Sequence, residues 1–195
     1  MATTVLLARH GETDWNAERR WQGHSDPPLN ERGREQARAL AEELGGAGIV
    51  AVYASDLRRS LETAEIVAAR LGLPVHADAR LREVDVGEWS GLTPDEIALR
   101  YPDAHARWIA YEGHGWVDGE SYEQLAERVV AALVEIAAEH PGGTVLAVTH
   151  GGPVRAVGAH CAGVPQLEYR RHHRVLGNCA VAAVAVEGRT IARLD

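Results

Sequence analysis

The tetrad Arg9-His10-Gly11-Glu12 directly follows an apolar run, Val5 to Ala8, that reads as a buried strand. In open α/β sheets, ligands bind at the edge where parallel strands end and loops begin. Arginine offers a planar fork of donors that matches phosphate oxygens, and neutral histidine offers a nucleophilic nitrogen. The pairing of these two residue types at a strand end therefore predicts phosphoryl chemistry.

Two further strand ends carry side chains of the same kinds. Ser55, Asp56 and Arg58 follow the apolar run at 49–54, and His150-Gly151-Gly152 follows the run at 145–149. If the three strands are parallel neighbours, all of these groups emerge at one edge of the sheet. Each helix that begins there also offers free backbone N–H groups to an anion. We expect two histidines and two arginines, Arg9 and Arg58, to converge on one pocket.

The chemistry of phosphoryl transfer assigns further roles. His10 can attack phosphorus if its ring is neutral, while Arg9, Arg58 and His150 can hold the phosphate oxygens. A carboxylic acid must give a proton to the leaving oxygen. Spacing alone does not choose that acid among Glu83, Asp85 and Glu88. Arg59 reads as a solvated helix residue, or as one that pairs with a nearby carboxylate.

The periodicity of the chain predicts the elements that position these groups. Continuous apolar runs at 5–8, 49–54, 145–149 and 180–186 predict strands that are covered on both faces, and helix-period segments lie between them. Ser121 with Gln124 suits a capping box, and Pro153 suits the first turn of a helix that ends near Ala162. This alternation predicts a three-layer α/β/α sandwich with a mainly parallel central sheet.

The length of 195 residues predicts a single domain, 1–195. Residues 10–29 read as a loop because they are polar and rich in glycine and proline. Residues 84–120 hold three tryptophans, two prolines and several glycines, which predicts a lid-like insertion over one edge of the sheet. The tryptophans are interpreted as packing residues.

Composition excludes several classes of function. The sequence contains no lysine, so it has neither a P-loop lysine nor a Schiff-base residue. The net charge of −8 argues against nucleic-acid binding, and no apolar run approaches the length of a membrane span. Two cysteines favour a reducing, cytoplasmic compartment. A nicotinamide enzyme is disfavoured because no glycine-rich Rossmann loop follows the first strand.

Five motifs in order resemble the histidine phosphatase superfamily, also called the phosphoglycerate mutase-like family, over nearly the whole chain. The matching segments are Arg9-His10-Gly11-Glu12-Thr13 with Asn16 and then Gln22-Gly23, Ser55-Asp56-Leu57-Arg58-Arg59-Ser60 with Thr63-Ala64, Leu81-Arg82-Glu83 with Gly87-Glu88-Trp89 and Gly91-Leu92-Thr93, Asp118-Gly119-Glu120-Ser121, and Val148-Thr149-His150-Gly151-Gly152. Ser90 departs from the pattern, because many relatives have Glu there. We interpret this departure as a change at the pocket rim.

The resemblance implies a role for each matched position. His10 would become phosphorylated, and Glu83 would protonate the leaving oxygen and then activate water. Arg9, Arg58 and His150 would line the phosphate pocket. Further contacts would come from Gly11, Asn16, Gln22, Gly23 and Gly151. No metal and no cofactor would be needed, because arginines supply the positive charge.

The predicted activity is that of a metal-independent phosphomonoesterase, in the phosphatase branch of the family, acting on a small phosphate ester. One alternative is a cofactor-dependent phosphoglycerate mutase, although the short 84–120 segment favours the phosphatase branch. Another is a catalytically inactive binding protein on the same fold. We expect no nucleic-acid or membrane partner, and a monomer or a homodimer.

Overall fold

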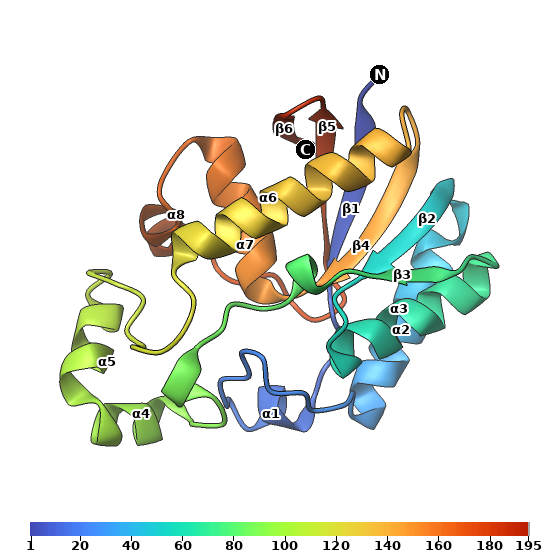
Figure 1. The fold of residues 1–195 in the computed structure, drawn as a ribbon. Coiled ribbons are helices and arrows are strands. Elements are labelled where there is room, and N and C mark those ends of the chain that lie inside the picture. Colours follow the sequence, from blue (N-terminus) through green and yellow to red (C-terminus); the bar gives the residue numbers. More distant parts are fainter. Residues whose placement is uncertain (195) are drawn as a thin grey trace.

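A computed structural model describes residues 1–194, and Figure 1 shows a central sheet with helices on both of its faces. The strands are β1 (Thr3–Arg9), β2 (Ile49–Ala54), β3 (Val75–Ala77), β4 (Thr144–Thr149), β5 (Val181–Glu187) and β6 (Thr190–Leu194). The helices are α1 (Asp14–Ala17), α2 (Glu31–Glu43), α3 (Arg58–Leu71), α4 (Pro94–Arg100), α5 (Pro102–Ile109), α6 (Tyr122–Glu139), α7 (Gly151–Ala162) and α8 (Gln166–His172). Three short 3-10 turns are η1 (Leu44–Gly46), η2 (Ala79–Leu81) and η3 (Gly87–Trp89).

The strand order of the sheet is β3-β2-β4-β1-β5-β6. The pairs β1–β4, β2–β4 and β2–β3 are parallel, whereas β5 runs antiparallel to β1 and β6 antiparallel to β5. These observations confirm the predicted α/β/α sandwich with a mainly parallel sheet. Because β4 lies between β1 and β2, the carboxyl ends of all three strands meet at one edge.

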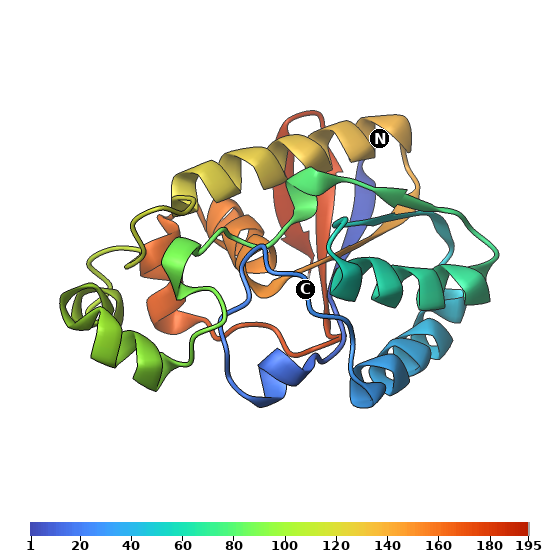
Figure 2. The same ribbon diagram turned by 60° about the horizontal axis from the view of Figure 1, so that its bottom comes forward.

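The alternation of side chains along each strand builds two hydrophobic layers. Val5 and Leu7 of β1 face α6 and α7, and Ala8 faces the layer that contains α2 and α3. Figure 2 shows α6 on one side of the sheet and α2 with α3 on the other. The near-continuous apolar runs are therefore explained by burial on both faces.

Local signals in the sequence account for the starts of two long helices. The Ser121 side chain accepts the Gln124 N–H and the Gln124 side chain accepts the Ser121 N–H, which confirms the capping box of α6. Helix α7 runs from Gly151 to Ala162 with Pro153 in its first turn, as predicted. No helix within residues 1–194 combines the length and the apolar character that crossing a membrane requires.

Several short elements were not predicted, namely β3, β6, α1, α4, α5, α8 and the 3-10 turns. Strand β3 has three residues, and β6 exposes most of its side chains at the edge of the sheet, so neither gives a strong apolar run. The loop prediction for residues 10–29 was wrong for one turn, α1. Its N-cap Thr13 forms a capping box with Asn16, and helices this short carry almost no periodicity.

Residues 84–120 form η3, α4, α5 and the chain around them, at the end of the sheet toward which β1 runs (Figure 1). Trp89 and Trp116 are buried, and their rings pack against each other and against Trp21 of the N-terminal loop. Trp108 of α5 contacts Trp21 and Trp89 edge-on. The interpretation of the tryptophans as packing residues is confirmed for Trp89 and Trp116.

The core beneath α6 predicts a large effect of truncation. Leu125 is fully buried, so Leu125→Ala should lower the free energy of unfolding by about 2–5 kcal/mol. Leu99→Ala is the control, because that side chain is 83% exposed and its loss should change stability by about 0.5 kcal/mol or less. Urea unfolding of both variants measures the difference, and equal stabilities would contradict this view of the core.

Candidate active site

The three predicted strand ends meet at one edge, and His10 after β1 lines a single cavity of about 350 Å³ with Gly151 and Gly152, which follow β4. His10 follows β1, and His150 follows β4, the central strand of the three. Their ring centroids lie 5.1 Å apart with the planes tilted by 58°. The sheet topology thus brings together two histidines that are 140 positions apart in the chain.

His10 is held as a neutral imidazole with one defined tautomer. Its Nδ1 lies 2.7 Å from the Gly11 carbonyl oxygen, which can only accept, so Nδ1 carries the hydrogen. The lone pair is therefore on Nε2. Burial lowers the pKa of His10 well below 6.5, and the positive charges of Arg59 and Arg9 lower it further. A buried, neutral imidazole of this kind is suited to nucleophilic attack.

His150 is fully buried and is also held neutral. Burial is the largest cause of its lowered pKa, and Arg59 adds to the effect. Its Nε2 lies 2.8 Å from the Ser55 hydroxyl oxygen, which also accepts the Leu57 N–H. The Nδ1 atom of His150 has no hydrogen-bond partner within residues 1–194.

Arg9 and Arg59 are the buried arginines next to the histidines. Arg9 donates to the Leu176 carbonyl oxygen at 2.7 Å, and Arg59 donates to the carbonyl oxygens of Ser25 and Gly23 at 2.7 and 2.9 Å. Burial lowers the pKa of both guanidinium groups, that of Arg59 to about 10, so both remain charged at neutral pH. These carbonyl contacts neutralise neither charge, which leaves both available to an anion.

The placement of Arg58 corrects the sequence prediction. Arg58 is exposed and does not line the cavity, whereas Arg59, interpreted as solvated, is completely buried and does. The buried face of α3 is rotated away from the apolar stripe through Leu57 and Leu61. Ser60 and Thr63 lie on that face because their hydroxyls bond to the Val148 carbonyl oxygen and the Gly11 N–H. Polar residues that are buried with hydrogen-bond partners are missed when the buried face of a helix is predicted from apolar residues alone.

Glu83 is the candidate acid that lines the cavity. Its Oε1 accepts the N–H groups of Val84 and Gly152, each at 2.9 Å. Gly152 lies in the first turn of α7, so the carboxylate sits at the positive end of that helix. A Cβ at Gly152 would overlap Glu83 Oε1, and the close approach therefore requires glycine.

The other two candidate acids are held elsewhere. Asp85 accepts the Gly87 N–H at 3.0 Å, and Glu88 accepts the N–H groups of Val117 and Asp118. Both carboxylates therefore organise the backbone of the 84–120 segment. Neither lines the cavity.

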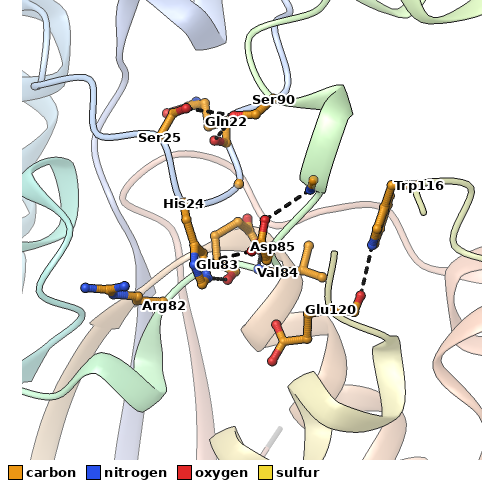
Figure 3. A network of polar contacts seen from close by, with 12 residues as sticks. Gln22, His24, Ser25, Arg82, Glu83, Val84, Asp85, Ser90, Trp116 and Glu120 are labelled. Atoms are coloured by element: carbon orange, nitrogen blue, oxygen red, sulfur yellow. Dashed lines mark hydrogen bonds and ion pairs between the residues drawn. The ribbon is translucent and has the colours of Figure 1, made fainter. Parts of the chain in front are cut away.

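The backbone at Glu83 is anchored from two sides. His24 Nε2 donates to the Glu83 carbonyl oxygen at 2.9 Å, and Figure 3 shows the imidazole pointing at this stretch of chain. Arg128 of α6 donates to the same oxygen and to the carbonyl oxygens of Arg80 and Arg82. The Arg128 guanidinium is in turn paired with the Glu120 carboxylate. The position of the Glu83 backbone is thereby fixed to α6 and to the N-terminal loop.

The remaining predicted residues differ in placement. Asn16, Gln22, Gly23 and Gly151 line the cavity with His10, whereas His150 is fully buried behind its wall. Gly23 has a φ of +49°, and a Cβ there would collide with Val86, so the loop needs glycine at this point. Gly11 does not line the cavity, since its N–H donates to Thr63 at 3.0 Å. It supports the loop instead.

Ser90 takes part in a polar cluster beside the cavity wall. Its hydroxyl lies 2.7 Å from the Ser25 hydroxyl and donates to the Gln22 carbonyl oxygen at 3.0 Å (Figure 3). The serine therefore ties the 84–120 segment to the loop that carries Gln22 and Gly23. This placement agrees with the interpretation that the departure at Ser90 alters the rim.

Sequence reasoning missed the far end of the cavity. Arg155 of α7, Gln166 of α8 and Tyr122 of α6 line it, together with Trp108 of α5. One signal was available for Arg155, because it lies four residues after Gly151 and so on the same face of α7. The other three come from elements whose positions only the tertiary structure reveals.

Comparisons with known proteins agree with this geometry. The chain is 41% identical over 157 residues to phosphoglycerate mutase-like protein 4 of Arabidopsis thaliana, covering 78% of this chain and 68% of the relative. It is 38% identical over 160 residues to phosphoserine phosphatase 1 of Hydrogenobacter thermophilus, covering 81% and 74%. The structure of mycobacterial glucosyl-3-phosphoglycerate phosphatase in complex with VO3 has 33% identity and a TM-score of 0.87, covering 97% of this chain and 95% of that one.

The resemblance drawn from the motifs is confirmed by a match over almost the whole sequence. Residues 5–194 fit the sequence profile of one family, a stretch that includes both histidines and every side chain placed above. The chain belongs to the histidine phosphatase superfamily, branch 1.

Proposed function

We propose that the protein is a metal-independent phosphomonoesterase that acts on a small phosphorylated metabolite through a phosphohistidine at His10. The observation that carries this proposal is the neutral His10 imidazole in one cavity with Arg9, Arg59 and Glu83. Such a cavity supplies a nucleophile, positive charge for the phosphate oxygens and a proton donor. The names of the related phosphatases support the same activity.

In the first step, the His10 Nε2 lone pair forms a bond to phosphorus while the ester P–O bond breaks. The leaving oxygen takes the electron pair and a proton from Glu83. Oε2 is the atom that carries this proton, because two backbone N–H groups at 2.9 Å occupy Oε1. The N-terminus of α7 then stabilises the carboxylate that remains.

In the second step, Glu83 removes a proton from water, and the water oxygen attacks phosphorus. The N–P bond breaks, its electron pair returns to His10, and phosphate leaves. In this proposal Arg9, Arg59 and His150 bind the oxygens in both steps. Because guanidinium groups supply the charge, the proposed steps require no metal, and residues 1–194 contain no group of three or more His, Cys, Asp or Glu side chains arranged to hold one.

A phosphoglycerate mutase is the second candidate, because several relatives carry mutase or mutase-like names. Both activities load His10 with a phosphoryl group and differ in whether water or a sugar acid removes it. An assay with 3-phosphoglycerate and a trace of 2,3-bisphosphoglycerate separates them. A phosphatase releases phosphate, a mutase interconverts the isomers, and an inactive binding protein does neither.

The nucleophile assignment predicts that His10→Ala abolishes turnover. Wild-type protein incubated with a radiolabelled ester in EDTA and quenched in alkali should retain label, because phosphoramidates survive alkali. His10→Ala should retain none while unfolding cooperatively. Label on another side chain of the variant, or full activity, would contradict the assignment.

The acid assignment predicts a dependence on the leaving group. Glu83→Gln should slow hydrolysis of alkyl phosphates by about 10²–10⁴-fold, and hydrolysis of p-nitrophenyl phosphate much less, because nitrophenolate leaves without a proton. Gly152→Ala should show the same pattern, since the added Cβ displaces Glu83 Oε1. Gly45→Ala is the matched control, since its Cβ would meet a single atom, at 3.9 Å. Equal losses with both kinds of ester would point to another acid.

The buried neutral state of His10 predicts a pH dependence of stability. Its folded pKa lies well below 6.5, so an acidic solution protonates the unfolded imidazole first and favours unfolding. One unit below pH 6.5, this effect lowers the free energy of unfolding by about 1.4 kcal/mol. His10→Gln should therefore lose less stability than wild type between pH 7.5 and 5.5 in urea unfolding. Identical pH dependence would show that burial leaves this imidazole free to protonate.

A further inference from the structure

Besides the proposed catalytic groups, the cavity is lined by polar side chains from three helices. Arg155 comes from α7, Gln166 from α8 and Tyr122 from α6, and all three line the same cavity as His10 and Glu83. Arg155 lies one helical turn beyond Gly151, whose backbone lines the cavity beside His10. A ligand whose phosphate lies against His10 would therefore share this cavity with Arg155.

Polar atoms at this end are buried without protein partners. Gln166 is 7% exposed, and neither its amide oxygen nor its amide nitrogen has a hydrogen-bond partner within residues 1–194. The same holds for Nε of Arg155 among these residues. A buried polar group without a bond destabilises a protein, so such groups in a cavity wall point to a ligand that completes them.

The charges of the cavity also exceed what one phosphate group needs. Arg9, Arg19, Arg20, Arg59 and Arg155 line it, and Glu83 is the one acidic side chain among the described residues that do so. Arg20 is paired with Glu18 and Glu96, and a phosphate dianion is matched by Arg9 and Arg59. Burial lowers the pKa of Arg155, and the nearby positive charge of Arg170 lowers it further. An additional negative group on the ligand would relieve this repulsion.

Arg170 is not itself available to that group. It donates to the Tyr122 hydroxyl at 3.2 Å and to the Trp108 carbonyl oxygen, and its guanidinium lies over the Trp108 ring at 4.2 Å. Arg19 also lines the cavity but is exposed to solvent, so Arg155 and Gln166 remain as the groups with buried polar atoms that a ligand could complete. One guanidinium and one amide match the single charge and planar shape of a carboxylate better than a second phosphate dianion.

We propose that Arg155 and Gln166 form a second subsite that binds a carboxylate, so that the preferred substrates are phosphate esters of small carboxylic acids. This inference rests on the proposed phosphatase function. Arg155 binds the carboxylate oxygens through its donor fork, and Gln166 donates its amide N–H to the same group. The Gln166 carbonyl oxygen accepts from a hydroxyl or ammonium group on the adjacent carbon.

Two esters that differ at one carbon test this proposal. 3-Phosphoglycerate carries a carboxylate where glycerol 3-phosphate carries a hydroxymethyl group. Wild-type protein should show kcat/KM about 10- to 100-fold higher for 3-phosphoglycerate, as expected for a charge-assisted contact. Arg155→Met should bring this selectivity ratio close to one, Arg155→Lys should retain part of it, and Gln166→Leu should lower it severalfold.

The ratio separates recognition from general damage, because a distorted site loses rate with both esters alike. Arg171→Met removes an exposed positive charge on the same side of the molecule and should keep the wild-type ratio. If Arg155→Met does not fold, Gln166→Leu and the wild-type ratio still test the proposal. A wild-type ratio near one, or a ratio that survives in Arg155→Met, overturns the carboxylate subsite. Failure to release phosphate from either ester, or from p-nitrophenyl phosphate, would instead overturn the phosphatase function.

A bisphosphate arm distinguishes the kind of anion. Fructose 1,6-bisphosphate carries a second phosphate and no carboxylate. If it is turned over faster than 3-phosphoglycerate, and Arg155→Met removes that advantage, the subsite binds phosphate and the proposal is wrong. If 3-phosphoglycerate and phosphoserine are preferred over it, the carboxylate assignment is supported.

Discussion

The site depends on keeping an imidazole uncharged beside guanidinium groups. His10 and His150 lie with their ring centroids 5.1 Å apart, and Arg59 lowers the pKa of both. Burial is the larger cause in each case, because removal from water disfavours the protonated ring. In open solvent the same histidines would be partly charged at neutral pH and would repel the arginines. The sandwich architecture provides the buried strand edge that prevents this.

Much of that edge could be predicted from the sequence, because strand ends are local features. The runs before His10 and His150 are strongly apolar, and parallel pairing of β1 with β4 places both residues at the same edge. The capping box at Ser121 and Pro153 in the first turn of α7 likewise depend on neighbouring residues alone. Features of this kind need no knowledge of the tertiary structure.

What could not be predicted depends on contacts between distant segments. Arg59 is buried because carbonyl oxygens of the N-terminal loop accept its N–H groups. The sequence of α3 alone does not predict those partners. Glu83 could not be separated from Asp85 by spacing, because the distinction lies in the N–H of Gly152, 69 residues away. The far wall with Gln166 was missed for the same reason.

The contact between Glu83 and Gly152 has a consequence for how the site can vary. The carboxylate is held by main-chain N–H groups, which every residue type except proline provides, so substitutions elsewhere cannot delete its partners. The contact is instead sensitive to substitution of Gly152, because only glycine lacks a Cβ that would overlap Glu83 Oε1. A single methyl group there would displace the Glu83 carboxylate from both of its main-chain partners.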